Sequence, residues 1–506
     1  MFPYVNNRCT DYSCSVHNQR SPLKGMEKGR KNILDLEHKR NSYSCFARRQ
    51  ILKQGLYYAA MVAGLSPSLW IGGCKKQTTN IPTNVILISI DTLRADHLGC
   101  YGYSRPTSPI LDRLASQGLL FENVMSTSPW TLPAHGTLLT GLYPSRHGLT
   151  AYNTRLPAGI ITLADILKEH GFLTAAIVNT HVLTARYGLN QGFSDFTYVD
   201  ENLRLREPTR VGAKAVKWLS KHKTEPFFLF LHYFDIHSDY CSLPYYEKQF
   251  VRPYQGFADG TTKQLIDFYR GQVHFDQNDA EHLIDLYDAS IRQMDDGIAH
   301  LLQLLDFNEL LDKSLVIVTS DHGEEFLDHG GVLHSRTQYQ ELIHVPLIVR
   351  GPGITHSKRI KHPVSLVDIM PTILSLLAID KPAWLDGLDL CPLWQKSDFK
   401  LAPRYLFAEG SRIMLPDKKI KDIDIKRAVR HFRYKLHYDK STKAVQLYDL
   451  WNDPREKIDV AAKHANLVGS MLSQLKDFMN IGIKGAPLPP LSPQDVQKLK
   501  SLGYLG

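Results

Sequence analysis

The chain has 506 residues, of which 43% are hydrophobic and 22% charged; these ordinary globular values exclude a mostly disordered, collagenous or multi-span membrane protein. The formal net charge is +9, but residues 1–76 hold 13 Lys and Arg against 4 Asp and Glu, so the rest of the chain carries 47 residues of each sign. A neutral body gives no support for nucleic-acid binding.

The N-terminal segment has the pattern of an export signal. Its unbroken apolar run, residues 56–65, is far shorter than the ~20 residues of a bilayer-spanning helix and has the length of a signal-peptide core. Upstream, Arg48-Arg49 resembles a twin-arginine export motif, and downstream Cys74 follows small residues, as the lipidated cysteine of a bacterial lipobox does. We expect an exported protein of the bacterial cell envelope or periplasm with a lipid anchor at Cys74. The alternative is an accidental arginine pair and a buried cysteine, and translation can also begin at Met26.

From residue 84 onward, apolar runs alternate with helical patterns. The expected strands are residues 84–90, 172–178, 226–231, 314–320 and 346–350, and the expected helices are residues 108–117, 161–170, 210–221, 281–305 and 364–377. Continuous apolar runs of this length are typical of strands buried on both faces. The alternation predicts an α/β fold with a large mixed, mostly parallel sheet sandwiched by helices.

The pattern changes beyond residue 395. Residues 427–437 and 445–449 have the alternation of antiparallel strands joined by a turn at residues 439–442, and residues 467–480 predict a covering helix. We therefore expect a small C-terminal antiparallel-sheet subdomain. The predicted organisation is an export signal and tether at residues 1–83, a main domain at residues 84–395 and this subdomain at residues 396–506.

Four of the expected strands end in a side chain that can carry chemistry. These side chains are Asp91, Asn179 with His181 close behind, His232 followed by Asp235 and His237, and the pair Asp321-His322. Ligands bind beyond the carboxyl ends of the strands in such sheets, so we expect the active site at this edge. Together Asp91, Asp321 and His322 predict a divalent metal site; mixed ligands suit zinc or manganese, and an all-oxygen set suits calcium or magnesium. Singly, Asp91 is also explained as a helix cap and His322 as a structural histidine.

Thr131 stands at the start of a predicted helix within residues 128–141. The free N–H groups and partial positive charge of a helix N-terminus can bind an anionic ester and stabilise an alkoxide. A nearby metal ion would lower the pKa of the hydroxyl further. By itself, however, Thr131 is better explained as a helix cap.

Over residues 84–459 the chain resembles the sulfatase family of the alkaline-phosphatase superfamily. Residues 84–102 are similar to the family's first strand and metal loop, and residues 131–141 follow its Cys/Ser-x-Pro-x-Arg-x-x-x-x-Thr-Gly signature. Three more blocks match, at residues 320–324, 339–346 and 447–454. The resemblance implies the sulfatase fold, an ester hydrolase, and a divalent ion (zinc, manganese, calcium or magnesium) held by Asp91, Thr131, Asp321 and His322.

Departures from the family pattern bear on the reaction. Sulfatases use a formylglycine made from Cys or Ser, whereas this position is Thr131, which cannot be converted to the aldehyde. The second aspartate of the first strand is replaced by Thr92, and the signature arginine by His135. What remains resembles the phosphodiesterase and the phosphoglycerol or phosphoethanolamine transferase branches, in which a metal-held threonine is the nucleophile. The resemblance therefore favours a phosphodiester over a sulfate ester.

By the same resemblance, further residues belong to the site. The expected catalytic residues beside Thr131 are His135, His237 and His334, and the expected substrate contacts are Asn179, His181 and Arg336. His334 is expected to assist the leaving group or to hold a second metal, with a surface position as the alternative; for His237 the alternative is a structural role. The expected partner is a sulfuric or phosphoric ester of a glycan or lipid head group. Two alternative functions stay open: an envelope transferase of phosphoethanolamine or phosphoglycerol, and a degenerate sulfatase that binds anionic glycans without turnover.

Overall fold

The computed structural model describes residues 81–200, 209–354, 357–396, 398–410, 426–483 and 485–501, which belong to one compact unit. The expected export signal, with Arg48, Arg49 and Cys74, lies outside the described residues. Within the described ranges, no helix combines the length and apolar composition that crossing a membrane would need.

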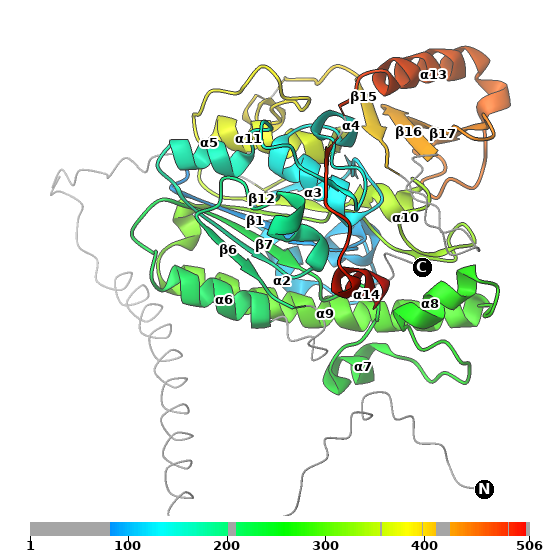
Figure 1. Cartoon of the computed structure of the whole chain (residues 1–506), viewed down its shortest axis with the longest axis horizontal. Helices are drawn as coiled ribbons and strands as arrows, with labels where there is room; N and C mark the ends of the chain where they lie inside the picture. Colours follow the sequence, from blue (N-terminus) through cyan, green and yellow to red (C-terminus); the bar gives the residue numbers. More distant parts are fainter. Residues whose placement is uncertain are drawn as a thin grey trace, which may run out of the picture. The chain divides into compact units, whose positions relative to one another are not determined.

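An eight-stranded sheet lies at the centre of this unit (Figure 1). Its strand order is β13-β2-β12-β8-β1-β7-β5-β6. The strands are β1 (Asn84–Ile90), β2 (Leu119–Phe121), β5 (Leu173–Val178), β6 (Asp195–Tyr198), β7 (Phe227–Tyr233), β8 (Ser314–Thr319), β12 (Leu347–Arg350) and β13 (Lys358–Ile360). Strands β8, β1, β7, β5 and β6 run parallel, whereas β12 is antiparallel to both β8 and β2. The mixed, mostly parallel sheet expected from the sequence is confirmed.

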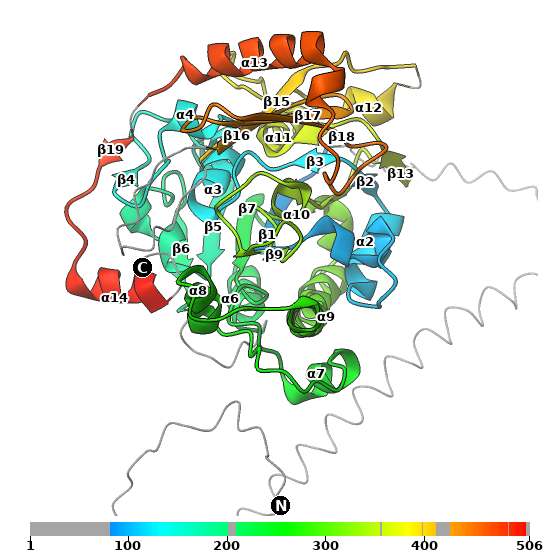
Figure 2. The same ribbon diagram turned by 90° about the vertical axis from the view of Figure 1, so that its right-hand side faces the viewer.

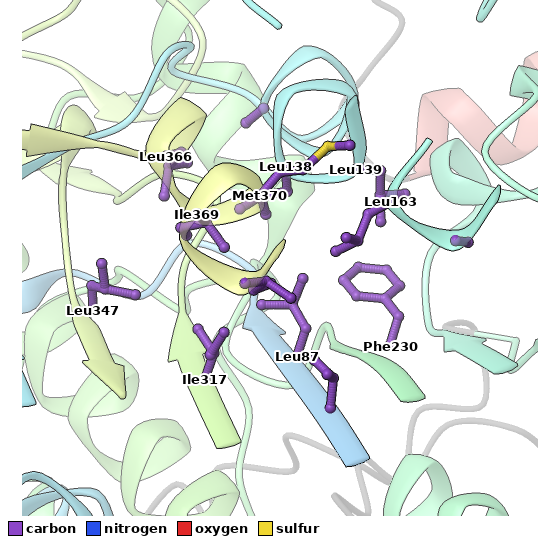
Figure 3. Packing of buried hydrophobic residues seen from close by; sticks show 14 of the residues in the cluster. Leu87, Leu138, Leu139, Leu163, Phe230, Ile317, Leu347, Leu366, Ile369 and Met370 are labelled. Carbon is purple, nitrogen blue, oxygen red and sulfur yellow. The ribbon is translucent and has the colours of Figure 1, made fainter. Parts of the chain in front are cut away.

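Helices cover both faces of the sheet. Because successive side chains of a strand point to opposite faces, Val85 and Leu87 of β1 lie in one hydrophobic core, and Ile86, Ile88 and Ile90 lie in the other. The first core includes side chains of α3 (Thr131–Thr140), α5 (Leu163–Glu169) and α11 (Ile369–Leu376), which surround Leu87 in Figure 3. The second includes side chains of α2 (Pro109–Ser116), α6 (Thr209–Leu219) and α9 (Gln277–Phe307). Both faces of the sheet are therefore covered by apolar side chains, and the polar side chains that can carry chemistry lie at the strand ends.

The C-terminal sheet differs from its prediction at one turn. Residues 427–437, expected as one strand, form two antiparallel strands, β16 (Lys426–His431) and β17 (Tyr434–Asp439). The chain reverses at Phe432-Arg433, where Phe432 has φ 54° and no Gly, Asn, Asp or Pro marks the turn. With β15 (Tyr405–Ala408) and β18 (Val445–Asp449) these strands make a four-stranded antiparallel sheet, and α13 (Ala465–Met479) packs against it as expected.

Strand β3 (Val124–Met125) connects the two regions. It pairs with β14 (Val364–Ser365), so the helix expected from residue 364 begins only with α11, after a short 3-10 turn. Met125 of β3 also packs in a small buried cluster with Leu342, Ile343, Leu406, Ala408 and Ala428. The antiparallel sheet therefore shares buried surface with the main body.

After α13 the chain returns toward the main sheet (Figure 2). We call residues 481–483 and 485–501 the C-terminal segment. Its strand β19 (Ala486–Pro487) pairs with β4 (Thr154–Arg155), and helix α14 (Pro493–Ser501) follows. Leu499 of α14 is fully buried in the same core as Leu87.

Candidate active site

The centre of the site is a cluster of two carboxylates and one imidazole. Asp91 follows β1, and Asp321 and His322 follow β8; because these strands are parallel neighbours, their carboxyl ends meet. All three side chains are fully buried, and one ligand atom from each lies within 4.8 Å of the other two. His322 Nε2 is 3.3 Å from Asp321 Oδ2 and 3.7 Å from Asp91 Oδ1.

Hydrogen bonds orient this cluster toward a common point. The Nδ1 of His322 lies 2.9 Å from the carbonyl oxygen of Gly323, which can only accept, so Nδ1 carries the proton and Nε2 presents its lone pair. Asp321 Oδ1 accepts the backbone N–H groups of Thr92 and His322, at 3.2 and 2.8 Å. Among the described residues, Asp321 Oδ2 and Asp91 Oδ1 accept no hydrogen bond although both are buried. A lone pair and two unpaired carboxylate oxygens fit a divalent cation.

The electrostatics support the same fit. Burial raises the pKa of Asp91 to about 7, although the charge of His322 and the hydroxyl of Thr131 act to lower it. Burial also raises the pKa of the nearby Glu324 to about 8. Holding ionised carboxylates close together in a buried site is unfavourable in free energy, and a bound cation removes this penalty.

Thr131 lies beside this cluster. It is the first residue of α3, follows Trp130 in extended conformation, and is fully buried. Pro133 sits in the first turn, where a missing N–H costs nothing. The Thr131 Oγ1 is 3.4 Å from His322 Nε2, so the hydroxyl, the metal-type ligands and the free N–H groups of a helix N-terminus meet in one place.

Two further buried histidines contact the cluster and its neighbours. His135, one turn after Thr131, has Nδ1 2.8 Å from the Thr131 carbonyl oxygen and Nε2 2.9 Å from Ser89 Oγ, and burial lowers its pKa to about 3. It therefore ties the first turn of α3 to β1. His232 Nε2 lies 3.2 Å from Asp91 Oδ2, and burial lowers its pKa to about 4. The sequence placed His232 at the end of a strand, but its contact with Asp91 could not be predicted because it depends on the pairing of β1 with β7.

His334 lies beside both His322 and His237. The ring of His334 is 4.4 Å from that of His322 and 5.0 Å from that of His237, which stacks on Phe234. The Nδ1 of His334 is 2.9 Å from Glu324 Oε1, so a buried carboxylate orients the imidazole. Glu324 was not among the residues expected from the sequence; its spacing, two residues after His322, was the available signal.

The three expected substrate contacts have other partners in the structure. Asn179 Nδ2 donates to the carbonyl oxygen of Val199 at 2.9 Å. His181 Nε2 is 3.3 Å from a carboxylate oxygen of Asp495, and the guanidinium of Arg336 lies 3.9 Å from the centre of the Tyr269 ring. Their roles toward a substrate stay predictions.

Comparison with known proteins identifies the family of the chain that carries this site. The family model Sulfatase matches residues 83–379, and a model described as N-sulphoglucosamine sulphohydrolase, C-terminal, matches residues 328–480. Arylsulfatase K of Homo sapiens is 24% identical over 480 residues, covering 84% of this chain and 88% of that protein.

Two solved structures are similar in fold. A protein in complex with its substrate D-glucosamine-2-N,6-O-disulfate has a TM-score of 0.66 at 18% identity, covering 79% of this chain and 98% of that chain. The phosphonate monoester hydrolase of Agrobacterium radiobacter has a TM-score of 0.64 at 20% identity, covering 79% and 95%. Because the Sulfatase model spans more than half of the chain and includes Asp91, Thr131 and Asp321-His322, this chain belongs to the sulfatase family of ester hydrolases.

Proposed function

We propose that this protein is a metal-dependent hydrolase that uses Thr131 as its nucleophile and prefers a phosphodiester to a sulfate ester. The observation that carries the proposal is the position of the Thr131 hydroxyl. It begins α3 and lies 3.4 Å from His322 Nε2, within the same buried centre as Asp91 and Asp321.

The residues present fit the divalent ion that sulfatase-family enzymes generally use. Asp91, Asp321 and His322 would hold it, with Thr131 Oγ1 beside them, and this mixed oxygen and nitrogen set suits zinc or manganese. Once bound, the ion would supply positive charge that lowers the pKa of a neighbouring hydroxyl and neutralises an anionic ester.

Different groups of this chain then carry the successive steps of the proposed reaction. The N–H groups of the first turn of α3 bind an ester oxygen. Thr131 Oγ1 releases its proton to solvent and forms a bond to phosphorus as the bond to the leaving oxygen breaks. Protonated His334, with its Nδ1–H held by Glu324, delivers the Nε2 proton to that leaving oxygen. Water then attacks phosphorus and gives a proton back to His334 Nε2. The bond from phosphorus to Thr131 Oγ1 breaks, and Oγ1 takes up a proton from solvent.

The proposed preference for a phosphodiester over a sulfate ester follows from the use of Thr131 as the nucleophile. A formylglycine hydrate has a second hydroxyl on the reacting carbon that expels sulfate, and threonine has none. A sulfated Thr131 would therefore persist, whereas attack of water on phosphorus resolves a phosphothreonine. One structural neighbour is a phosphonate monoester hydrolase and another binds a sulfated glucosamine, so a sugar-linked ester is the first substrate class to test.

The test compares kcat/KM for matched aryl phosphodiester and aryl sulfate on the metal-loaded protein. We expect the phosphodiester to be faster, and Thr131→Ala to lose ~10³-fold or more in kcat while Thr131→Ser keeps part of it. Thr140→Ala, at the far end of α3 with a hydroxyl that bonds the Gly136 carbonyl oxygen, is the matched control and should keep wild-type kcat. A clear preference for sulfate would reject the phosphoryl assignment and return this chain to the ordinary sulfatases.

A transferase remains the second candidate because a covalent threonine ester can be resolved by an alcohol as well as by water. Adding glycerol to the phosphodiester assay distinguishes the two. Transfer of the phosphoryl group to glycerol in preference to water would identify a transferase, whereas hydrolysis unaffected by glycerol supports the hydrolase.

A further inference from the structure

The loop that carries His334 has an unusual backbone conformation. His334 follows strand β10 (Val332–Leu333), and its ring lies 4.4 Å from that of His322. Its two neighbours in the chain, Leu333 and Ser335, have φ angles of 62° and 80°, in the left-handed region that residues other than glycine rarely adopt. Two such residues in a row around one histidine persist only where other contacts hold the backbone.

A side chain from a distant helix bonds this backbone at two points. Tyr269 is the last residue of α8 (Thr262–Tyr269), and its hydroxyl accepts the N–H of Val332 at 2.8 Å and donates to the carbonyl oxygen of the same residue. In the described part of the chain, β10 pairs with β9 (Glu325–Phe326) alone. The Tyr269 hydroxyl therefore bonds both polar groups of Val332 as the backbone of a second neighbouring strand would. Because Val332 is buried, water cannot readily replace this hydroxyl.

The loop is also tied on the other side of His334. The N–H of Ser335 donates to the carbonyl oxygen of Pro129 at 2.9 Å, and Pro129 lies two residues before Thr131. His334 is thus placed between two backbone anchors, one from α8 and one from the segment that leads into α3. Of these two anchors, only the bond to Tyr269 is made by a side chain, so it is the one that a substitution can remove.

We propose that Tyr269 is a positioning residue of the active site, because its hydroxyl holds residues 332–335 in the conformation that places His334 beside His322. The inference rests on the proposed function in one respect, namely that His334 gives a proton to the leaving oxygen. Glu324 orients the ring of His334 through Nδ1, at 2.9 Å, whereas Tyr269 acts on the backbone from which that ring extends. Without the hydroxyl, the left-handed residues on either side of His334 are free to relax, and the ring leaves its place.

The first test is Tyr269→Phe, which removes the hydroxyl and keeps the ring that lies 3.9 Å from the guanidinium of Arg336. The measured quantity is kcat for a phenyl and a nitrophenyl phosphodiester on the metal-loaded protein. We expect kcat for the phenyl ester to fall about fivefold or more and that for the nitrophenyl ester to stay within about twofold, because only the poorer leaving group needs the proton. If Tyr269 acts through His334, adding Tyr269→Phe to His334→Gln should cause no further loss.

A second measurement does not depend on turnover. In protein labelled with isotopes in its histidine rings, the NMR signal of His334 is the one that His334→Gln lacks. We expect this signal to move in Tyr269→Phe, because the ring changes its distance from the neighbouring ring of His322.

The matched control is Tyr254→Phe. The hydroxyl of Tyr254 makes the same kinds of bond, since it accepts the N–H of Ala258 at 2.8 Å and donates to Asp279, but it does not contact the loop of His334. This variant should leave kcat and the His334 signal unchanged, and thermal unfolding of both variants shows that each is folded when it is assayed. An equal loss for the two esters, a loss of the same size in the His334→Gln background, or an unmoved His334 signal would overturn the proposal.

The two proposals can fail separately. If the wild type hydrolyses esters but Tyr269→Phe changes neither kcat for the phenyl ester nor the His334 signal, the role of Tyr269 is rejected and the enzyme assignment stands. If the wild type turns over no ester while the His334 signal moves in Tyr269→Phe and not in Tyr254→Phe, the hydrolase assignment is rejected and the positioning of His334 by Tyr269 stands.

Discussion

At the scale of single residues, the buried Glu324 fixes the orientation of its neighbour His334. Its Oε1 holds His334 Nδ1 at 2.9 Å, and burial raises the pKa of Glu324 to about 8 when no cation is near. The ring of His334 lies 4.4 Å from that of His322, so the proton donor that we propose stands beside a proposed metal ligand. His334 therefore depends on Glu324 for its orientation.

We expect Glu324→Gln to lower kcat about 10–100-fold, because proton delivery to the leaving oxygen is weakened. The loss should be larger for a phenyl ester than for a nitrophenyl ester, whose leaving group needs no proton. The chain offers a matched control in Glu341→Gln, which breaks a similar pair with His329 at 2.6 Å outside the cluster. An equal loss for both leaving groups would contradict a role in proton delivery.

The raised pKa values in the cluster predict a pH dependence of metal stabilisation. Without metal, Asp91 and Glu324 oppose folding once ionised, so the apo protein loses stability as pH rises from about 4 to about 8. A divalent ion binds the ionised form, so the Tm difference between metal-loaded and EDTA-treated protein should be larger near pH 8 than near pH 5. The lowered pKa values of His135 and His232 affect the metal-loaded and the EDTA-treated protein alike, so their contribution cancels in the Tm difference. A difference that does not vary with pH would mean that Asp91 is not a ligand.

At the scale of elements, the sequence predicts best where burial is complete. Strands β1, β5, β7 and β8 were expected within two residues of their bounds because both of their faces are apolar. The strand expected at residues 427–437 was wrong because alternation continues through Phe432-Arg433, and only the positive φ of Phe432 shows the reversal. The sequence also placed Asp91, Thr131, Asp321 and His322 in one site, which the structure brings together. It could not show the contacts of His232, Glu324 and Asp495, since each depends on the pairing or orientation of distant elements.

The buried Glu456 joins the antiparallel sheet to the main body. It contacts Lys435 and His437 of β17, each at 2.8 Å, and accepts the N–H of Gln340, the first residue of α10 (Gln340–Ile343), at 2.7 Å. Burial acts to raise the pKa of Glu456, but Lys435 and His437 hold it at about 2. Its contribution to stability is therefore complete above about pH 4.5 and is lost as the pH falls toward 2.

We expect Glu456→Gln to lower the free energy of unfolding by about 3–5 kcal/mol, because it leaves Lys435 buried without its counter-ion. Acid should then destabilise the variant less than the wild type between about pH 4.5 and 2. The control Glu281→Gln removes a surface partner of Arg252 and should cost less than about 1 kcal/mol. Equal, small losses of stability in urea unfolding would show that the buried pair does not hold the sheet.

For the whole molecule, we propose that Arg48-Arg49 directs export and that Cys74 anchors the mature protein. Replacing both arginines by lysine should trap the precursor inside the cell, and Cys74→Ser should release the exported protein from the membrane fraction. Arg40→Lys, upstream of the pair, should leave export unchanged. Normal fractionation of the double arginine variant would reject the export motif.

The position of β1 in the middle of the sheet has a consequence during synthesis. Asn84 pairs with Ser314, 230 residues later in the chain, and its other neighbour, β7, begins at Phe227. A ribosome that adds about 5–20 residues per second needs roughly 10–50 s for that interval. Throughout it, a strand that is apolar on both faces has emerged without its β8 partner, and such non-local pairing forms slowly. The central strand of the native sheet therefore lacks one of its two neighbours while 230 residues are added, and a chaperone that shields residues 84–90 until β8 emerges would raise the yield of folded protein.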